Sequence, residues 1–131
     1  MNDLIRELAR EWLARAEHDL RIAEFLRTMP DPPPEGLGFH AQQCVEKALK
    51  GPLTAFRIPF ERRHDLNYLL DLCLAIDPTI EQFRADADTL TPYAVEFRYP
   101  DALTDLALED ALQATETARR IYTFILARLE A

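Results

Sequence analysis

The 131-residue sequence contains only two cysteines, three glycines and one tryptophan. With so few cysteines, disulfides can contribute little to its stability. Cys44 and Cys73 both fall on apolar helical stripes, so we interpret them as small core residues and not as a disulfide. No cysteine–histidine spacing resembles a zinc site, and we expect neither a metal nor another cofactor. Stability must therefore come from burying the apolar residues, which make up 48% of the chain.

Long apolar runs are also missing. None approaches the roughly 18 residues that a membrane-spanning helix needs. The N-terminus, MNDLIRELAREW, lacks the apolar core of a secretion signal. We therefore expect a cytoplasmic protein with no membrane association. A chain of this length is typical of one domain, which we expect to span residues 1–131.

Positive charge is scarce overall, with a net charge of −8, and this disfavours broad sequence-independent binding of nucleic acid. Its distribution is uneven. Between Phe39 and His64, five basic residues stand against two acidic ones, a local charge of +3. From Asp65 to Glu116, two arginines stand against twelve carboxylates, a local charge of −10. A positive site on an acidic body could hold a nucleotide or a short RNA, or could meet the acidic face of another subunit.

Apolar residues recur with helical spacing in five segments, and no strand pattern competes. We predict a first helix capped by Asp3, a second from about Phe39 to Phe56, and a third starting near 64–65. The fourth and fifth are predicted over 79–90 and 104–129, with Thr104 as a cap. We expect Gly51-Pro52 to kink or break the second helix. The sum is an all-α domain, an up-and-down bundle of four to five helices.

Two residues of the first predicted helix bear on its packing. Trp12 shares a stripe with Leu8 and Ala16, so we expect it to be mostly buried. Asp19 falls close to that stripe. It is either exposed at the rim or a buried acceptor for a basic residue on a neighbouring helix.

A polar stripe on the second predicted helix is the main candidate for a binding site. Lys47 and Lys50 are three residues apart and share a helix face, with His40 and Gln43 one turn earlier. The alternative for each residue is an ordinary solvated surface position. The full set of candidate ligand-binding residues is His40, Gln43, Lys47, Lys50, His64 and Arg98.

His64 has two interpretations. It could cap the start of the third helix, or it could be a working histidine in a cleft beside arginines and Lys47. We hypothesise the second. Three aromatic residues further along the chain could supply apolar contact in a dimer, namely Tyr93, Phe97 and Tyr99.

Four blocks of the sequence, AEHDL, FHAQQCVEKALK, RRHDL and EFRYPD, resemble the HEPN family (higher eukaryotes and prokaryotes nucleotide-binding). They occur in the family's order over nearly the whole chain. The resemblance implies a four- or five-helix bundle that commonly forms homodimers. It also implies a partner, because many members act beside a minimal nucleotidyltransferase as a toxin–antitoxin pair.

Ribonuclease members of the family carry an arginine, four to six residues, and then a histidine. Arg57 and His64 fit this spacing, but Ile58 follows the arginine where a polar residue is usual, and Pro59 interrupts any helix holding both. We therefore predict a binding and interaction module, a homodimeric partner of a nucleotidyltransferase with a cleft for a nucleotide or polyanion. The alternative is a metal-independent endoribonuclease with Arg57 and His64 as its catalytic residues.

Overall fold

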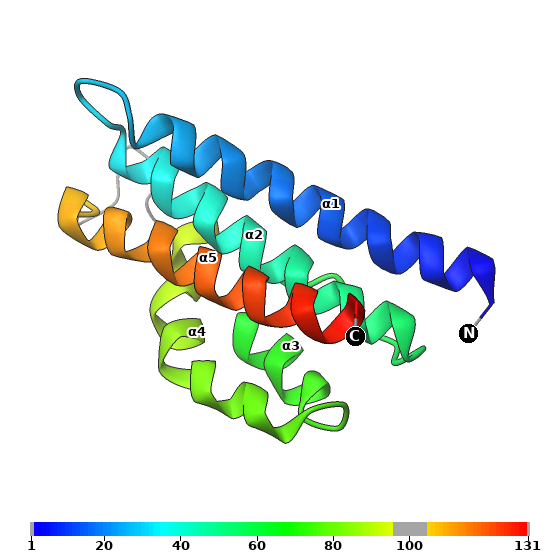
Figure 1. Cartoon of the computed structure of the whole chain (residues 1–131). Coiled ribbons are helices and arrows are strands. Elements are labelled where there is room, and N and C mark those ends of the chain that lie inside the picture. The colour runs from blue at the N-terminus through cyan, green and yellow to red at the C-terminus, as the bar shows by residue number, and fades with distance from the viewer. Residues whose placement is uncertain (1, 96–104, 131) are drawn as a thin grey trace.

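The structure is a computed structural model and describes residues 2–95 and 105–130 (Figure 1). Every regular element within these residues is a helix, which confirms the all-α bundle. In chain order the elements are α1 (Asp3–Leu26), α2 (Pro34–Ala55), α3 (Leu66–Cys73), η1 (Pro78–Phe83), α4 (Arg84–Leu90), η2 (Thr91–Ala94) and α5 (Leu108–Glu130).

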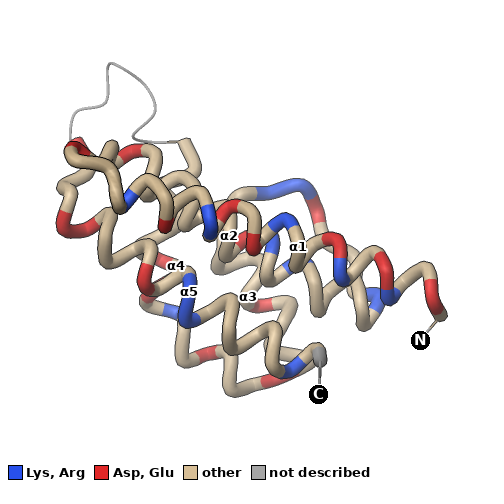
Figure 2. Tube along the Cα trace, turned by 45° about the horizontal axis from the view of Figure 1, so that its top comes forward, with Lys and Arg blue, Asp and Glu red and all other residues tan. Residues whose placement is uncertain are grey.

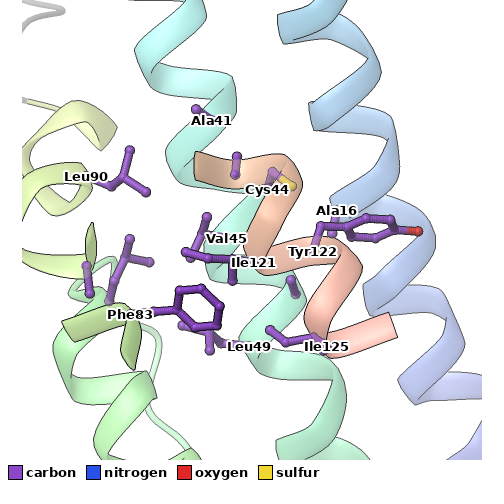
Figure 3. Packing of buried hydrophobic residues seen from close by; sticks show 14 of the residues in the cluster. Ala16, Ala41, Cys44, Val45, Leu49, Phe83, Leu90, Ile121, Tyr122 and Ile125 are labelled. Atoms are coloured by element: carbon purple, nitrogen blue, oxygen red, sulfur yellow. The ribbon is translucent and has the colours of Figure 1, made fainter. Parts of the chain in front are cut away.

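Helix α2 occupies the centre of the bundle. It runs antiparallel to α1, and α5 and the short helices α3 and α4 cover its other sides (Figure 1). Figure 3 shows apolar side chains of α2, α5 and η1 meeting on one side of α2, with α1 on the other. The largest fully buried apolar side chains are Leu37, Leu49 and Leu53 of α2, Leu66, Leu69 and Leu70 of α3, Leu90 of α4 and Ile121 of α5. Because α2 is covered almost all round, its polar side chains must find partners inside the protein.

The starts of the first two helices differ from the prediction. Asn2 and not Asp3 caps α1, and its Oδ1 accepts a hydrogen bond from the backbone N–H of Ile5 at 2.8 Å. Helix α2 begins at Pro34, several residues before Phe39. A proline in the first turn of a helix loses nothing, because the N–H that it lacks has no partner within the helix.

The end of α2 lies near Phe56, as predicted, but Gly51-Pro52 does not break the helix. The helix continues through Pro52 to Ala55 without a break. Arg57 then takes a left-handed conformation with φ at 57°. The N–H of Ile58 donates to the carbonyl of Leu53 at 2.8 Å, and the N–H of Arg57 donates to Thr54 at 3.1 Å. These two bonds form a Schellman motif, in which glycine usually holds the left-handed position.

The shorter helices are divided differently from the prediction. Helix α3 ends at Cys73, and the segment predicted as one helix over 79–90 is a 3₁₀ turn, η1, followed by α4. Asp77 caps η1, because its side chain accepts from the backbone N–H of Thr79. The predicted cap Thr104 lies outside the described residues, and α5 begins at Leu108.

The predicted apolar stripe of α1 is confirmed at Ala16 and wrong at Leu8. The buried apolar residues are Ala9, Leu13, Ala16, Leu20 and Ala23, whereas Leu8 is 45% exposed. Trp12 lies at the edge of this stripe and is mostly but not fully buried, as predicted. Its ring packs edge-on against Phe60 at a centroid distance of 6.2 Å.

Gly38 gives a direct test of how tightly α2 is packed. A Cβ atom at this position would come within 2.6 Å of Leu106 and 3.3 Å of the Tyr93 ring. We expect Gly38→Ala to lower the free energy of unfolding by about 1–3 kcal/mol, measured by urea denaturation, because overpacking outweighs the gain in helix propensity.

Gly36→Ala is the matched control for this substitution. The nearest neighbour of its added Cβ is Cδ1 of Leu26, which is farther away, at 3.1 Å, and only partly buried, so it can move aside more easily than the buried Leu106. This variant should be neutral or more stable by up to about 1 kcal/mol. Equal stability of the two variants would contradict the packing described around Gly38.

Candidate functional site

Asp19 is the centre of the first polar cluster between α1 and α2. Its side chain is 9% exposed and accepts from two α2 side chains. The Nδ1 atom of His40 lies 2.8 Å from Oδ1, and the Nζ atom of Lys47 lies 2.6 Å from Oδ2. Of the two interpretations of Asp19 drawn from the sequence, the structure confirms the buried acceptor and not the residue exposed at the rim.

The charge state of Asp19 follows from this arrangement. Burial by itself raises the pKa of the Asp19 carboxyl, but the hydrogen bonds and positive charge of His40 and Lys47 outweigh burial. The pKa of Asp19 is therefore below its ordinary value. The carboxylate is the stable form across the neutral range, and it neutralises Lys47 within the bundle.

Glu46 of α2, the residue before Lys47, is the centre of the second polar cluster. Its side chain is 4% exposed and accepts from three groups. His64 Nδ1 lies 2.8 Å from Oε1, Lys50 Nζ lies 3.0 Å from Oε2, and Gln42 Nε2 lies 3.3 Å from Oε1. Because a carboxylate can only accept, the His64 proton must sit on Nδ1, which leaves Nε2 as the acceptor of a neutral ring.

Gln42 and Gln43 join this second cluster to the segment before α3. Gln42 Nε2 also donates to the carbonyl oxygen of His64 at 2.9 Å, and Gln43 Nε2 donates to Oε1 of Gln42 at 2.8 Å. His64 does not cap α3. The cap is Asp65, whose side chain accepts from the backbone N–H groups of Asn67 and Tyr68. His64 is thus held by α2 through both its ring and its backbone.

Lys50 is enclosed by aromatic rings as well as by Glu46. Its Nζ lies 5.1 Å from the centroid of Trp12 and 5.7 Å from that of Phe60. Trp12 belongs to α1 and Phe60 to the connection between α2 and α3, so Lys50 joins three parts of the chain. With a side chain only 10% exposed, Lys50 is a structural cation in this arrangement.

The connection between α2 and α3, residues 56–65, carries the exposed positive charge of this region. Figure 2 shows it as a blue arc beside α1. Arg57 and Arg62 are exposed and make no ion pair with any residue that the structure describes. Arg63 stacks its guanidinium over the Tyr68 ring at 4.1 Å. The His64 side chain is 62% exposed. We call these four residues the basic connection.

The residues predicted to form one polar stripe therefore belong to two separate clusters. His40 and Lys47 contact Asp19, whereas Gln43, Lys50 and His64 belong to the Glu46 cluster. Lys47 and His64, expected to share a cleft, are held by different carboxylates. Arg98 lies outside the described residues.

Two further expectations concern other side chains. Tyr93, expected at a dimer surface, is buried, while Phe97 and Tyr99 lie outside the described residues. Burial raises the pKa of the Cys73 thiol to about 12 and that of Cys44 further, so neither is a nucleophile at neutral pH. Within residues 2–95 and 105–130, no group of three metal-ligating side chains could hold a metal ion. No helix of these residues is long and apolar enough to cross a membrane.

Sequence reasoning did not identify Glu46 and Gln42 as members of the site. A pattern was present, because Gln42, Glu46 and Lys50 recur every four residues and so share one helix face. What the pattern does not show is that this face is buried, with Gln42 at 0% and Glu46 at 3% exposure.

The fold and the two polar clusters define the class of this protein. It is an all-α bundle in which buried carboxylates pair with basic residues around one central helix. The HEPN domain family matches residues 9–129, and the chain belongs to this family. The crystal structure of TT1696 from Thermus thermophilus is similar, with a TM-score of 0.70 and 30% sequence identity, over 91% of this chain and 96% of that one. No curated protein matches the chain.

The Asp19 cluster gives a test that depends on pH. We expect Asp19→Asn to lower the free energy of unfolding at pH 7 by about 3 kcal/mol, because Lys47 would keep a charge with no carboxylate beside it. The native pKa of Asp19 is lowered, so its contribution is present above the unfolded pKa of about 3.9 and is lost as the pH falls through the native value. The difference between wild type and variant should therefore shrink below about pH 4.

Glu17→Gln is the control, since Glu17 is an exposed carboxylate on the same helix. Denaturation with urea at pH 7, 5 and 3 would measure both variants. A loss for Asp19→Asn that stays constant through acid pH would show that the carboxylate charge does not contribute.

Proposed function

We propose that this HEPN protein is a binding and interaction module whose polyanion-binding surface is the basic connection and not the α2 stripe. One observation carries the proposal. The cations of α2 that the sequence suggested are occupied by buried carboxylates, whereas Arg57, Arg62 and the ring of His64 are exposed on the connection that follows α2. Only the second group has charge available for a phosphate. Its ligand would be a nucleotide or a short RNA.

The left-handed conformation of Arg57 supports a role for its side chain. A residue other than glycine costs roughly 1–2 kcal/mol in this conformation. Glycine at this position of a Schellman motif would remove that cost. A strained arginine on the surface, with φ at 57°, is therefore a candidate for a residue kept for binding.

Arg57→Gly separates stability from binding. We expect the variant to be more stable by about 1 kcal/mol and to bind single-stranded RNA more weakly, as measured by fluorescence anisotropy. Each lost phosphate contact should reduce the slope of log affinity against log salt concentration by roughly 0.7. Arg62→Gln should reduce the slope similarly without the gain in stability.

Arg21→Gln is the matched control, because it removes one exposed arginine from the C-terminal half of α1. An equal loss of affinity in this control would mean that RNA responds only to net charge. Wild-type protein that fails to bind RNA or a nucleotide even at low salt would rule out the proposed surface.

An endoribonuclease is the second candidate, and one contact favours it. Glu46 fixes the Nδ1 proton of His64, so the Nε2 atom of an exposed imidazole could accept a proton from a 2′-hydroxyl group. Arg57 would stabilise the phosphate. Incubating RNA with wild type, His64→Ala and Glu46→Gln tests this. Cleavage by wild type that both variants lose would favour the nuclease, whereas binding without cleavage favours the module.

Homodimer formation and pairing with a minimal nucleotidyltransferase complete the proposed function. Two observations support a self-contact. The first is the opposite charge of the two chain segments, and the second is the exposed apolar face at the start of α1, where Leu4 is 65% and Leu8 45% exposed. The first turns of α1 extend beyond the other helices (Figure 1).

Light scattering at micromolar concentration should give about twice the chain mass of 15.1 kDa. Leu8→Glu should return the protein to a monomer because it places charge on the apolar face. Phe25→Glu, at the other end of α1 and 71% exposed in the wild type, should remain dimeric. A monomeric wild type would refute the dimer. Failure to co-purify with a nucleotidyltransferase encoded in the neighbouring reading frame would argue against that partner.

A further inference from the structure

A cavity of about 260 Å³ opens between the C-terminal turns of α2 and α5 and the segment leading from α3 into η1. We call it the α5 cavity. Eight of its ten lining residues are apolar, and the other two are Asp77 and Arg128. Mostly apolar walls with a few polar groups are typical of sites for small molecules and not of sites for nucleotides or RNA. The cavity therefore points to a function beyond the binding module proposed above.

The size of the cavity limits its ligand. An apolar cavity of about 150 Å³ in a protein interior can hold benzene. The α5 cavity is larger, at about 260 Å³, so one ring with a short substituent would fit. Ile76, Ile80 and Ile125 among its walls offer aliphatic contact to such a ring.

The polar group of the cavity is an ion pair with a fixed geometry. The Nε atom of Arg128 donates to Oδ2 of Asp77 at 2.6 Å, and its guanidinium stacks on the Phe124 ring at 3.4 Å. The other oxygen of Asp77 accepts from the backbone N–H of Thr79 at 2.9 Å and from its hydroxyl at 2.6 Å. Both charged groups are thus held in place before any ligand arrives.

This ion pair favours a neutral polar group over a charged one. The Nη2 atom of Arg128 donates to no described residue, so it can donate to an oxygen of a ligand. Oδ2 of Asp77 keeps a lone pair that can accept from an N–H group. The charges of the pair compensate each other, and a ligand carboxylate would meet the negative charge of Asp77. A primary amide offers one acceptor and one donor on the same edge and so matches both groups.

We propose that the α5 cavity binds a small, neutral molecule with one apolar ring and an amide-like end, which Arg128 and Asp77 recognise together. Phenylacetamide has this size and chemistry and is the probe for the test. Phenylacetate is its anionic comparison, with the same ring and nearly the same shape.

The test is a titration followed by ¹H–¹⁵N NMR on the full chain. We expect saturable shifts of the amide signals of residues 73–80 and 124–129, with affinity near 1 mM, about the range for a ligand of this size. Phenylacetate should bind roughly tenfold more weakly, because it loses the contact to Asp77 and adds repulsion.

Two variants and a control assign the site. Arg128→Met should weaken phenylacetamide binding by roughly tenfold, since it removes the donor and keeps an apolar stem of similar length. Its melting temperature should change little, because the Arg128 side chain is 48% exposed and an ion pair open to solvent contributes little to stability. Ile76→Phe should abolish binding by filling the cavity. Arg120→Met, on the same helix but away from the cavity, should bind like wild type.

Four results would overturn the proposal. They are the absence of saturable shifts, shifts confined to other residues, phenylacetate binding at least as tightly as phenylacetamide, and a change of the light-scattering mass in Ile76→Phe. The last result would mean that a second copy of the chain fills the cavity. Because none of these readouts uses RNA or the basic connection, the proposal can fail or succeed independently of the proposed function.

Discussion

The neutralisation of buried charge on α2 is the constraint on which the structure depends. This helix lies at the centre of the bundle, yet it carries Gln42, Glu46 and Lys50 at exposures of 0%, 3% and 8%. Unpaired polar groups at such depth would cost several kcal/mol each. Asp19 enters from α1 to hold Lys47 across the two helices, and Glu46 holds Lys50 one turn along α2 itself, so each buried charge has a partner of opposite sign.

The same pairing decides where chemistry can occur. The charge of Lys47 is neutralised by a buried carboxylate at 2.6 Å, so it attracts a phosphate only weakly. The polar stripe of α2 therefore stabilises the fold. His64 is different, because Glu46 fixes one ring nitrogen while the side chain stays 62% exposed. The second polar cluster thus orients an exposed imidazole on the same connection that carries the exposed arginines.

The α5 cavity and the basic connection both begin where α2 ends. Phe56 lines the cavity, and Arg57 follows it in the left-handed conformation. The Schellman motif that ends α2 therefore separates an apolar site from a cationic one within two residues. The backbone bonds of Arg57 and Ile58 fix this division, since they set the direction in which the chain leaves the helix.

Helical period and proline positions in the sequence were enough to predict an all-α bundle, and four sequence blocks indicated its family, because these patterns are local. Helix ends were less predictable. Pro34 starts a helix, which local propensity allows, but Pro52 lies within one, because neighbouring helices stabilise what local propensity disfavours. The candidate residues on α2 were named correctly as polar, and Asp19 was considered as a buried acceptor, but the sequence did not show which residue each of them contacts. Asp19 and Lys47 are 28 positions apart and Glu46 and His64 are 18 apart. Such pairs form only when helices pack, so the tertiary structure alone decided which cations are neutralised and which are free.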